Sequence, residues 1–291
     1  MQLSKRRSLS RERLRTLGGR CLFYAVLLAF AVVVAIPLIW VLGNALRPNA
    51  EIGQYTLLSL HTFVPARFTF ENFVNIFSEL NMVRVILNTV FVAITVTFSS
   101  LVVNSLAAYA FARIRFFAKG FLFVLIVSLL VLPIEILIIP LYLTIAQTGL
   151  KNTFWSLILP FIATPFGIFY MRQFYLNTPR TLDEAALLDG CGHGSIFFKI
   201  YLPLAKTPLI TLGLLAFLQQ WDSFIVPVTF IDVESRMLLQ VALTRLAIGL
   251  YANDYGILFA GVALSIVPMM IVYFCFQKYI VESVASTGIK G

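Results

Sequence analysis

Residues 184–203 read EAALLDGCGHGSIFFKIYLP, a stretch with three glycines that lies between two long apolar segments. Thr181 and Glu184 have the Thr-x-x-Glu spacing of a capping box, which predicts a helix that begins at a threonine cap. Gly190 is suited to the left-handed position that ends such a helix. The stretch therefore begins as a short capped helix followed by a turn.

A second short helix follows this turn. Ser195 can cap it, and Pro203 helps to stop it. Its apolar side chains are more than a short loop can bury alone, namely those of Phe197, Phe198, Ile200 and Tyr201. The first helix offers the small Ala185 and Ala186 and several carboxylates. On these residues alone, a hairpin packed on its own membrane domain and a docking element for a partner are equally good interpretations.

The composition indicates an integral membrane protein. The chain has 291 residues, of which 60% are hydrophobic and 12% are charged, whereas a soluble domain is about one-half apolar and one-quarter charged. A spanning helix needs about 20 mainly apolar residues, and barrel strands are much shorter. The sequence therefore predicts an all-α protein with six transmembrane helices, at 21–43, 84–111, 119–141, 152–173, 207–230 and 257–280.

Several of these predicted spans contain proline, including Pro133, Pro165 and Pro227. Each proline removes a backbone donor and tends to kink its helix. Outside the spans, the loop 44–83 has the pattern of an extended stretch followed by a short amphipathic helix. The loop 231–256 has enough helical period for a surface or re-entrant helix.

The net charge of +9 is distributed as expected for a membrane protein. In the six-span arrangement, 16 of the 22 Lys and Arg residues lie on one side, and the other side keeps Arg47, Arg67, Arg84, Lys151, Arg236 and Arg245. The positive-inside rule then places both termini in the cytoplasm. The charge indicates topology and contact with anionic lipid, and not a nucleic-acid partner.

These boundaries divide the chain into a basic cytoplasmic N-terminus, a first span, an extracytoplasmic loop, a core of five further spans with a cytoplasmic loop, and a tail. The corresponding residues are 1–20, 21–43, 44–83, 84–280 with the loop 174–206, and 281–291.

The residues give little support for an enzyme. Two histidines, His61 and His193, are too few and too far apart for a metal site. The three cysteines show no pairing pattern, and no nucleophile lies beside a base. The chain also lacks the G-x-x-x-x-G-K-[ST] sequence of a P-loop. We therefore expect no metal, no cofactor and no ATP bound by this chain.

The quoted stretch fits the pattern EAA-x3-G-x9-I-x-L-P and resembles the cytoplasmic loop of ABC importer permeases. All seven fixed places match: Glu184, Ala185, Ala186, Gly190, Ile200, Leu202 and Pro203. From about residue 20 onward the chain is similar to the MalG-like subunits of the carbohydrate-uptake branch, particularly in LPIEILIIPLYL (132–143), FLQQWDSFIVPV (217–228) and STGIKG (286–291). Three residues depart from the usual pattern: Cys191, Gly192 and Asp222.

This resemblance implies the MetI-like permease fold of type I importers, in the cytoplasmic (inner) membrane of a prokaryote. It implies four kinds of partner: a MalF-like second permease, two MalK-like ATPase subunits that bind ATP and magnesium, an extracytoplasmic solute-binding protein, and membrane lipid. The cargo would be a carbohydrate such as an oligosaccharide or glycoside.

The family's coupling helix would be the loop quoted above. The residues implied to act there are Glu184, Ala185, Ala186, Asp189, Gly190, Phe197, Ile200 and Pro203. Glu184 would contact the ATPase, Gly190 would permit the turn, and the aromatics of the second helix would anchor the loop. The tail near Lys290 is a further possible ATPase contact.

Four residues are candidates for the substrate pathway. Glu135 is an acidic residue inside a predicted span, where a carboxylate must face protein or water; it can contact sugar hydroxyls or sit at a helix end. Gln219, Trp221 and Asp222 form a polar and aromatic patch suited to sugars or to helix packing. Glycerol-3-phosphate or another solute is an alternative cargo. An ion-coupled carrier would rest on Glu135 alone, and a membrane enzyme would need a cluster of catalytic groups that the sequence lacks.

Overall fold

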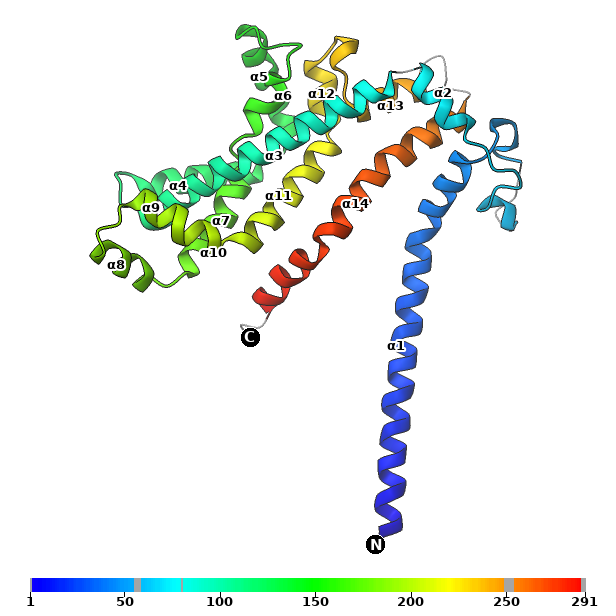
Figure 1. Ribbon diagram of the computed structural model, residues 1–291, viewed down its shortest axis with the longest axis horizontal. Coiled ribbons are helices and arrows are strands. Elements are labelled where there is room, and N and C mark those ends of the chain that lie inside the picture. Colours follow the sequence, from blue (N-terminus) through cyan, green and yellow to red (C-terminus); the bar gives the residue numbers. More distant parts are fainter. Residues whose placement is uncertain (1, 55–58, 80, 249–253, 289–291) are drawn as a thin grey trace. The chain divides into compact units, whose positions relative to one another are not determined.

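The computed structural model describes residues 2–54, 59–79, 81–248 and 254–288, and these ranges contain helices and no strand. Figure 1 shows the helices. Four of them are long and apolar enough to cross a membrane, and two sharply bent helix pairs bring the number to six if each pair is one span. The predicted all-α membrane fold is confirmed. The four single helices are Gly19–Ala45, Met82–Arg113, Trp155–Asn177 and Tyr255–Tyr279.

The chain forms two compact units, Met1–Ile76 with Tyr251–Ala263, and Phe77–Leu250 with Leu264–Gly291. The first unit contains α1 (Gln2–Ala45), the short turns η1 (Asn49–Glu51) and η2 (Leu60–Thr62), and the start of α2 (Glu71–Glu79). The helix α2 occupies the place where the sequence predicts a short amphipathic helix. The helix α1 is longer than the predicted first span, because it already begins at Gln2.

Buried polar groups hold the first unit together after α1 ends. The guanidinium of Arg47 is buried and donates to Asn44 Oδ1 at 2.9 Å. Asn72 Nδ2 donates to the carbonyls of Ala45 and Arg47 at 3.0 and 2.7 Å. These bonds satisfy carbonyls that a helix end leaves without partners. They fix the chain where it leaves the helix.

The second unit is built around α3 (Met82–Arg113), which packs against α7 (Pro165–Asn177) and α11 (Lys206–Trp221). Its buried side chains recur every three or four residues, as an amphipathic helix requires. Two interhelical hydrogen bonds reinforce the packing on α7. Asn104 Nδ2 donates to Thr164 Oγ1 at 3.1 Å, and the hydroxyls of Ser105 and Tyr175 are 2.6 Å apart.

The two ends of α3 meet different parts of the second unit (Figure 1). At one end lie α8 (Thr181–Leu188), α9 (His193–Ile196), the π-helical turn η5 (Phe197–Tyr201) and α10 (Leu202–Leu204). At the other end lies α13 (Leu239–Ile248), a largely buried helix in the loop 231–256, where the sequence predicts a surface or re-entrant helix. Its Leu239 amide donates to Thr89 Oγ1 of α3 at 2.9 Å. We call these the α8 end and the α13 end.

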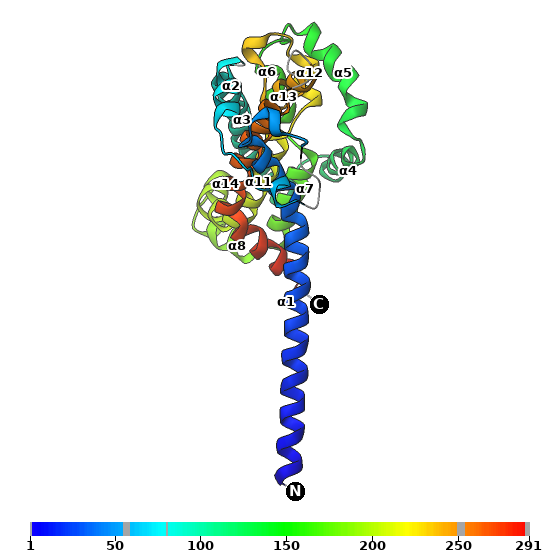
Figure 2. The same ribbon diagram turned by 90° about the vertical axis from the view of Figure 1, so that its right-hand side faces the viewer.

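The predicted helix 119–141 is wrong as a continuous helix. The structure has α4 (Lys119–Ser128) and η3 (Leu129–Val131), then a bend of 110° into α5 (Ile134–Gln147). Figure 2 shows the bend. Pro133 lacks the donor that would continue the helix, and the residue before a proline favours extended backbone. Leu132 has this conformation, with φ −86° and ψ 114°.

Two more predicted spans have interruptions near prolines, although Trp155–Asn177 still counts as one candidate span. In place of 207–230, α11 ends at Trp221 and α12 (Ile225–Phe230) follows; Pro227 has no N–H for the carbonyl of Ser223. In place of 152–173, α6 (Trp155–Ile158) and η4 (Leu159–Phe161) precede α7. Pro165 begins α7, and Thr164 caps it by accepting from the Gly167 amide. The last helix, α14 (Tyr255–Gly288), extends beyond the predicted 257–280.

Candidate functional site

The stretch from α8 to α10, residues 181–204, forms a helical hairpin, as the sequence predicts. Gly190 has φ +78° and follows the last turn of α8. Its amide donates to Leu187 O at 3.0 Å, and the Cys191 amide donates to Ala186 O at 2.9 Å. This pair of bonds is a Schellman motif, in which a left-handed glycine closes the helix. The turn therefore depends on Gly190, and Cys191 and Gly192 do not prevent it.

Both predicted N-caps are wrong. The helix α8 begins at Thr181 itself, with Arg180 in the cap position and no side-chain cap. Arg180 already has helical backbone angles, so its carbonyl accepts from the amides of Asp183 and Glu184. Thr181 thus lies one residue too far inside the helix to cap it. Likewise α9 begins at His193 after an extended Gly192, which places Ser195 within the helix.

Pro203 does not stop the second helix, contrary to prediction. The helical path continues through α10 to Leu204, and the 78° bend into α11 follows at Ala205. The turn before the proline is π-helical, a wider turn that commonly interrupts an α-helix. This change of hydrogen-bond register accommodates a residue that has no N–H.

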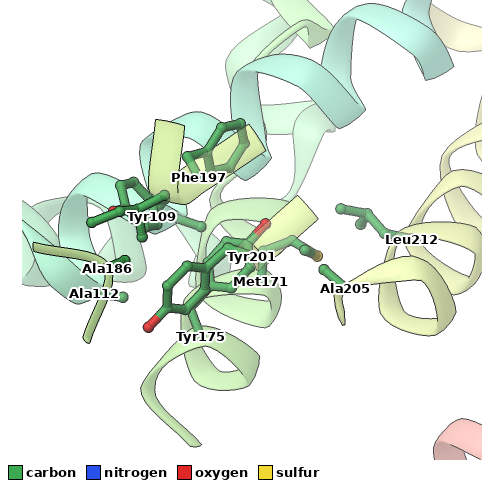
Figure 3. Packing of buried hydrophobic residues seen from close by; sticks show 11 residues of the cluster. Tyr109, Ala112, Met171, Tyr175, Ala186, Phe197, Tyr201, Ala205 and Leu212 are labelled. Atoms are coloured by element: carbon green, nitrogen blue, oxygen red, sulfur yellow. The ribbon is translucent and has the colours of Figure 1, made fainter. Parts of the chain in front are cut away.

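The inner side of the hairpin packs into the core of the second unit (Figure 3). Ala186, Phe197 and Tyr201 are buried against the C-terminal parts of α3 and α7. The Tyr109 ring centroid lies 5.2 Å from that of Phe197 and 5.1 Å from that of Tyr201. Phe197 and Tyr201 therefore attach the hairpin to its own membrane domain, whereas Phe198 of the same helix is 61% exposed.

The outer side of the hairpin is exposed. Glu184, Ala185 and Asp189 of the first helix all face away from the core. Leu188 beside them is 89% exposed, and Leu187 is also exposed. Of the other sequence-predicted residues, Gly190 and Pro203 are exposed and Ile200 is half-buried. The two alanines of the motif thus have different surroundings, because Ala186 faces the core and Ala185 faces outward.

Sequence reasoning missed one residue that holds the hairpin to the core, Arg113 at the end of α3. Its Nη1 lies 3.5 Å from Oδ2 of Asp183 on α8, and the two side chains are 4% and 18% exposed. Its Nη2 donates to the carbonyls of Tyr175, at 2.5 Å, and of Thr178. Its guanidinium carbon lies 5.1 Å from the centre of the Tyr201 ring. No spacing rule links residues 70 positions apart, so only the fold reveals this contact.

The candidate pathway residues are not grouped as the sequence suggests. Glu135 is exposed and lies in the first turn of α5, directly after the bend. Trp221 is 1% exposed, and its Nε1 donates to Ser265 O at 3.0 Å, so its ring is part of the packing. Gln219 and Asp222 remain on the exposed side. Lys290 lies outside the described residues. Within the residues that the structure does describe, no group of three His, Cys, Asp or Glu is placed to hold a metal.

Sequence comparison assigns the family. Residues 100–286, which include the whole hairpin, match the family described as binding-protein-dependent transport system inner membrane component. The chain belongs to this family. It is a multi-pass protein of the inner membrane and a transport permease, and the predicted resemblance to ABC importer permeases is confirmed.

Individual relatives agree with this assignment over nearly the whole chain. The permease is 34% identical to the arabinooligosaccharides transport system permease protein AraQ of Halalkalibacterium halodurans, over 90% of this chain and 94% of AraQ. It is 31% identical to the diacetylchitobiose uptake system permease protein NgcG of Streptomyces coelicolor, over 90% of this chain and 86% of NgcG.

A solved structure confirms the fold. The permease superposes with a TM-score of 0.78 on a chain from the crystal structure of a bacterial ABC transporter involved in the import of alginate, an acidic polysaccharide. The match covers 89% of this chain and 95% of the other at 24% identity. It therefore shows the permease fold.

Proposed function

We propose that this permease imports an oligosaccharide or glycoside and takes its driving force from a separate ATPase that docks on the hairpin 181–204. The division of the hairpin into two sides carries the proposal. Its inner aromatics are locked into the core, whereas its outer side presents carboxylates next to exposed leucines. Such a surface suits a partner cleft that has an apolar floor and basic or amide donors at its rim.

The assembly that fits this surface has the composition the family resemblance implies. A MalF-like permease pairs with this chain, two MalK-like ATPases hold ATP and magnesium, and an extracytoplasmic binding protein delivers the solute. This chain then binds no nucleotide and catalyses no reaction. The hairpin and both termini lie on the cytoplasmic side, in agreement with the basic residues near them.

Transport follows from rigid-body movement. ATP draws the two ATPases together, and this moves the ATPase cleft in which each permease hairpin is docked. The movement of the hairpins shifts the permease helices between inward-open and outward-open arrangements. The rigid attachment of Phe197 and Tyr201 supports this mechanism, because a loosely held hairpin would absorb the movement instead of passing it on.

The saccharides named for AraQ and NgcG support a carbohydrate as cargo. In this chain, Glu135 is exposed where α5 starts after its bend, and Gln219 and Asp222 lie exposed at the end of α11. Irregular backbone inside a membrane protein is tolerated where it is covered by protein or lines a watery cavity. We assign these three polar groups to the pathway, as hydrogen-bonding partners for sugar hydroxyls.

The proposal is tested by purifying the permease with its partner subunits in lipid and comparing wild type with Glu184→Ala and Gly190→Asp. We expect both variants to lose ATPase association and solute-stimulated ATP hydrolysis while they still insert and fold. The matched control is Glu234→Ala, which changes an exposed acidic residue near the α13 end. This variant should behave as wild type. Full association by both hairpin variants would contradict the proposal.

A further inference from the structure

The contacts of α8 with the rest of the second unit are few. Ala186 is the buried residue of this helix, and most of its other side chains are exposed. Asp183 is the exception among its charged residues, since it turns inward and pairs with Arg113. Within the described residues, this is the one ion pair that α8 makes.

Arg113 joins four elements through one side chain. It belongs to the last turn of α3, it donates to two carbonyls at the C-terminal end of α7, it pairs with Asp183 on α8, and it lies over the Tyr201 ring in η5. A guanidinium has five donors in a rigid planar fork, so it can bind carbonyls and a carboxylate at once. A lysine ammonium has a single centre and cannot hold the same geometry.

We propose that Arg113 and Asp183 are positioning residues, which make α8 move together with α3 and α7 when the partner ATPase moves the hairpin. This inference rests on the proposed function, because it assigns a route to the movement that ATPase docking starts. The ion pair lies on the inner side of the same turn of α8 that presents Glu184 outward. A force on that turn is therefore transmitted to the C-terminal ends of both α3 and α7, through the ion pair and through the hydrogen bonds of Arg113 to the α7 carbonyls.

The contact between Arg113 and Asp183 suits this role because both side chains are largely shielded from water. An ion pair at low local dielectric is stiffer and less screened by salt than one at the surface. The carbonyl bonds from Nη2 hold the guanidinium in place when α8 is displaced. Removing the Asp183 charge would thus leave Arg113 anchored on α7 but free the first turn of α8.

The experiment compares transport with ATP hydrolysis in proteoliposomes that contain the whole complex with its binding protein and solute. We expect Asp183→Asn to keep ATPase association and most of the ATP hydrolysis, while the solute transported per ATP falls about fivefold, at the lower end of typical coupling effects. Arg113→Lys should give an intermediate ratio. Asp183→Glu, which keeps the charge, should restore the ratio toward wild type.

Asp232→Asn is the matched control, since it removes a carboxylate from a second, exposed ion pair in the same unit. Its transport-to-ATP ratio should equal that of wild type. A merely structural role of Asp183 would lower transport and hydrolysis in parallel with the amount of folded complex, and that result overturns the inference. An unchanged ratio in both Asp183→Asn and Arg113→Lys also overturns it. Loss of ATPase association in Glu184→Ala tests docking separately, so the two proposals can fail independently.

Discussion

Two ion pairs among the described residues of the second unit lie toward opposite ends of α3 and differ in nearly every physical respect. At the α8 end, Arg113 and Asp183 are largely buried, and the arginine has further bonds to α7. At the α13 end, Lys151 and Asp232 are 2.8 Å apart but 31% and 60% exposed, and they join two loops. The shorter contact is thus the more exposed one.

This difference shows that distance alone does not indicate what an ion pair contributes. Exposed pairs contribute at most about 1 kcal/mol and are screened by salt, whereas losing one partner of a buried pair costs about 3–5 kcal/mol. The α13 end is held mainly by other contacts, including the backbone of Asn152, whose amide donates to Phe230 O at 3.0 Å. The stability of the α8 end, in contrast, depends on the buried charges of Arg113 and Asp183.

The largest effect is expected from Arg113→Ala. It leaves the Asp183 carboxylate with little solvent and no cation, and it removes the donors from the ends of α7. We expect a loss of about 3 kcal/mol in stability, measured as a lower midpoint of thermal unfolding in detergent. Arg115→Ala, an exposed arginine in the following loop, should keep the wild-type midpoint. Equal unfolding midpoints for the two variants would show that the buried arginine contributes no more to stability than an exposed one.

A neutral hydrogen bond should matter most at the α13 end. Thr89 is buried, and its hydroxyl both donates to Val85 O at 2.8 Å and accepts from the Leu239 amide. Thr89→Val keeps the shape but leaves that amide without a partner, at a cost of about 2 kcal/mol. The same unfolding measurement should show a larger effect than Asp232→Asn produces. If the order is reversed, the exposed ion pair is what holds this end.

A smaller effect is expected at the hairpin turn. An added Cβ on Gly190 meets open space, so the cost of Gly190→Ala is the left-handed backbone alone, about 1 kcal/mol. Gly190→Asn should cost less, because asparagine tolerates this conformation. Amide hydrogen exchange of α8 is the measurement, with faster exchange in the alanine variant. Equal exchange in wild type, alanine and asparagine variants would show that the turn does not require glycine.

The smallest effect is a pH dependence at the α13 end. The hydrogen bond from Lys151 lowers the pKa of Asp232 below its ordinary value, and the same bond raises the pKa of Lys151. A lowered carboxyl pKa contributes stability above the ordinary value of about 4, and this contribution is lost as the pH falls through the lowered pKa. The raised pKa of Lys151 contributes below its ordinary value of about 10.4, and that contribution is lost as the pH rises through the raised one.

The small difference in unfolding midpoint between wild type and Asp232→Asn should therefore be present at neutral pH and vanish in acid. Added salt should also remove it, because both groups are exposed. A difference that persists in acid and in high salt would mean that Asp232 acts through packing and not through its charge.

Sequence patterns predicted what depends on local chemistry. Gly190 was identified correctly because a left-handed helix end favours glycine whatever surrounds it, and the apolar windows found the membrane helices. The caps at Thr181 and Ser195 failed because neighbouring residues, Arg180 and Gly192, decide where each helix starts. The prolines indicated kinks, but the size of each bend depends on packing between helices.

The site shows the same limit. The inward turn of Asp183 and the burial of Trp221 are properties of the assembled core, since their partners Arg113 and Ser265 are distant in sequence. Rules based on composition or short motifs cannot predict such pairs. The family resemblance located the hairpin but did not say which of its residues face inward.

The central claim, that a partner ATPase covers the outer side of the hairpin, is tested most directly by thiol accessibility. Leu188→Cys and, as a control, Glu234→Cys are prepared in a background where Cys21, Cys191 and Cys275 are replaced by serine. Each variant is labelled with a water-soluble maleimide, with and without the partner ATPase. We expect strong protection at Leu188→Cys and unchanged labelling at Glu234→Cys. Equal labelling of Leu188→Cys in the two conditions, in a complex that still contains the ATPase, would contradict it.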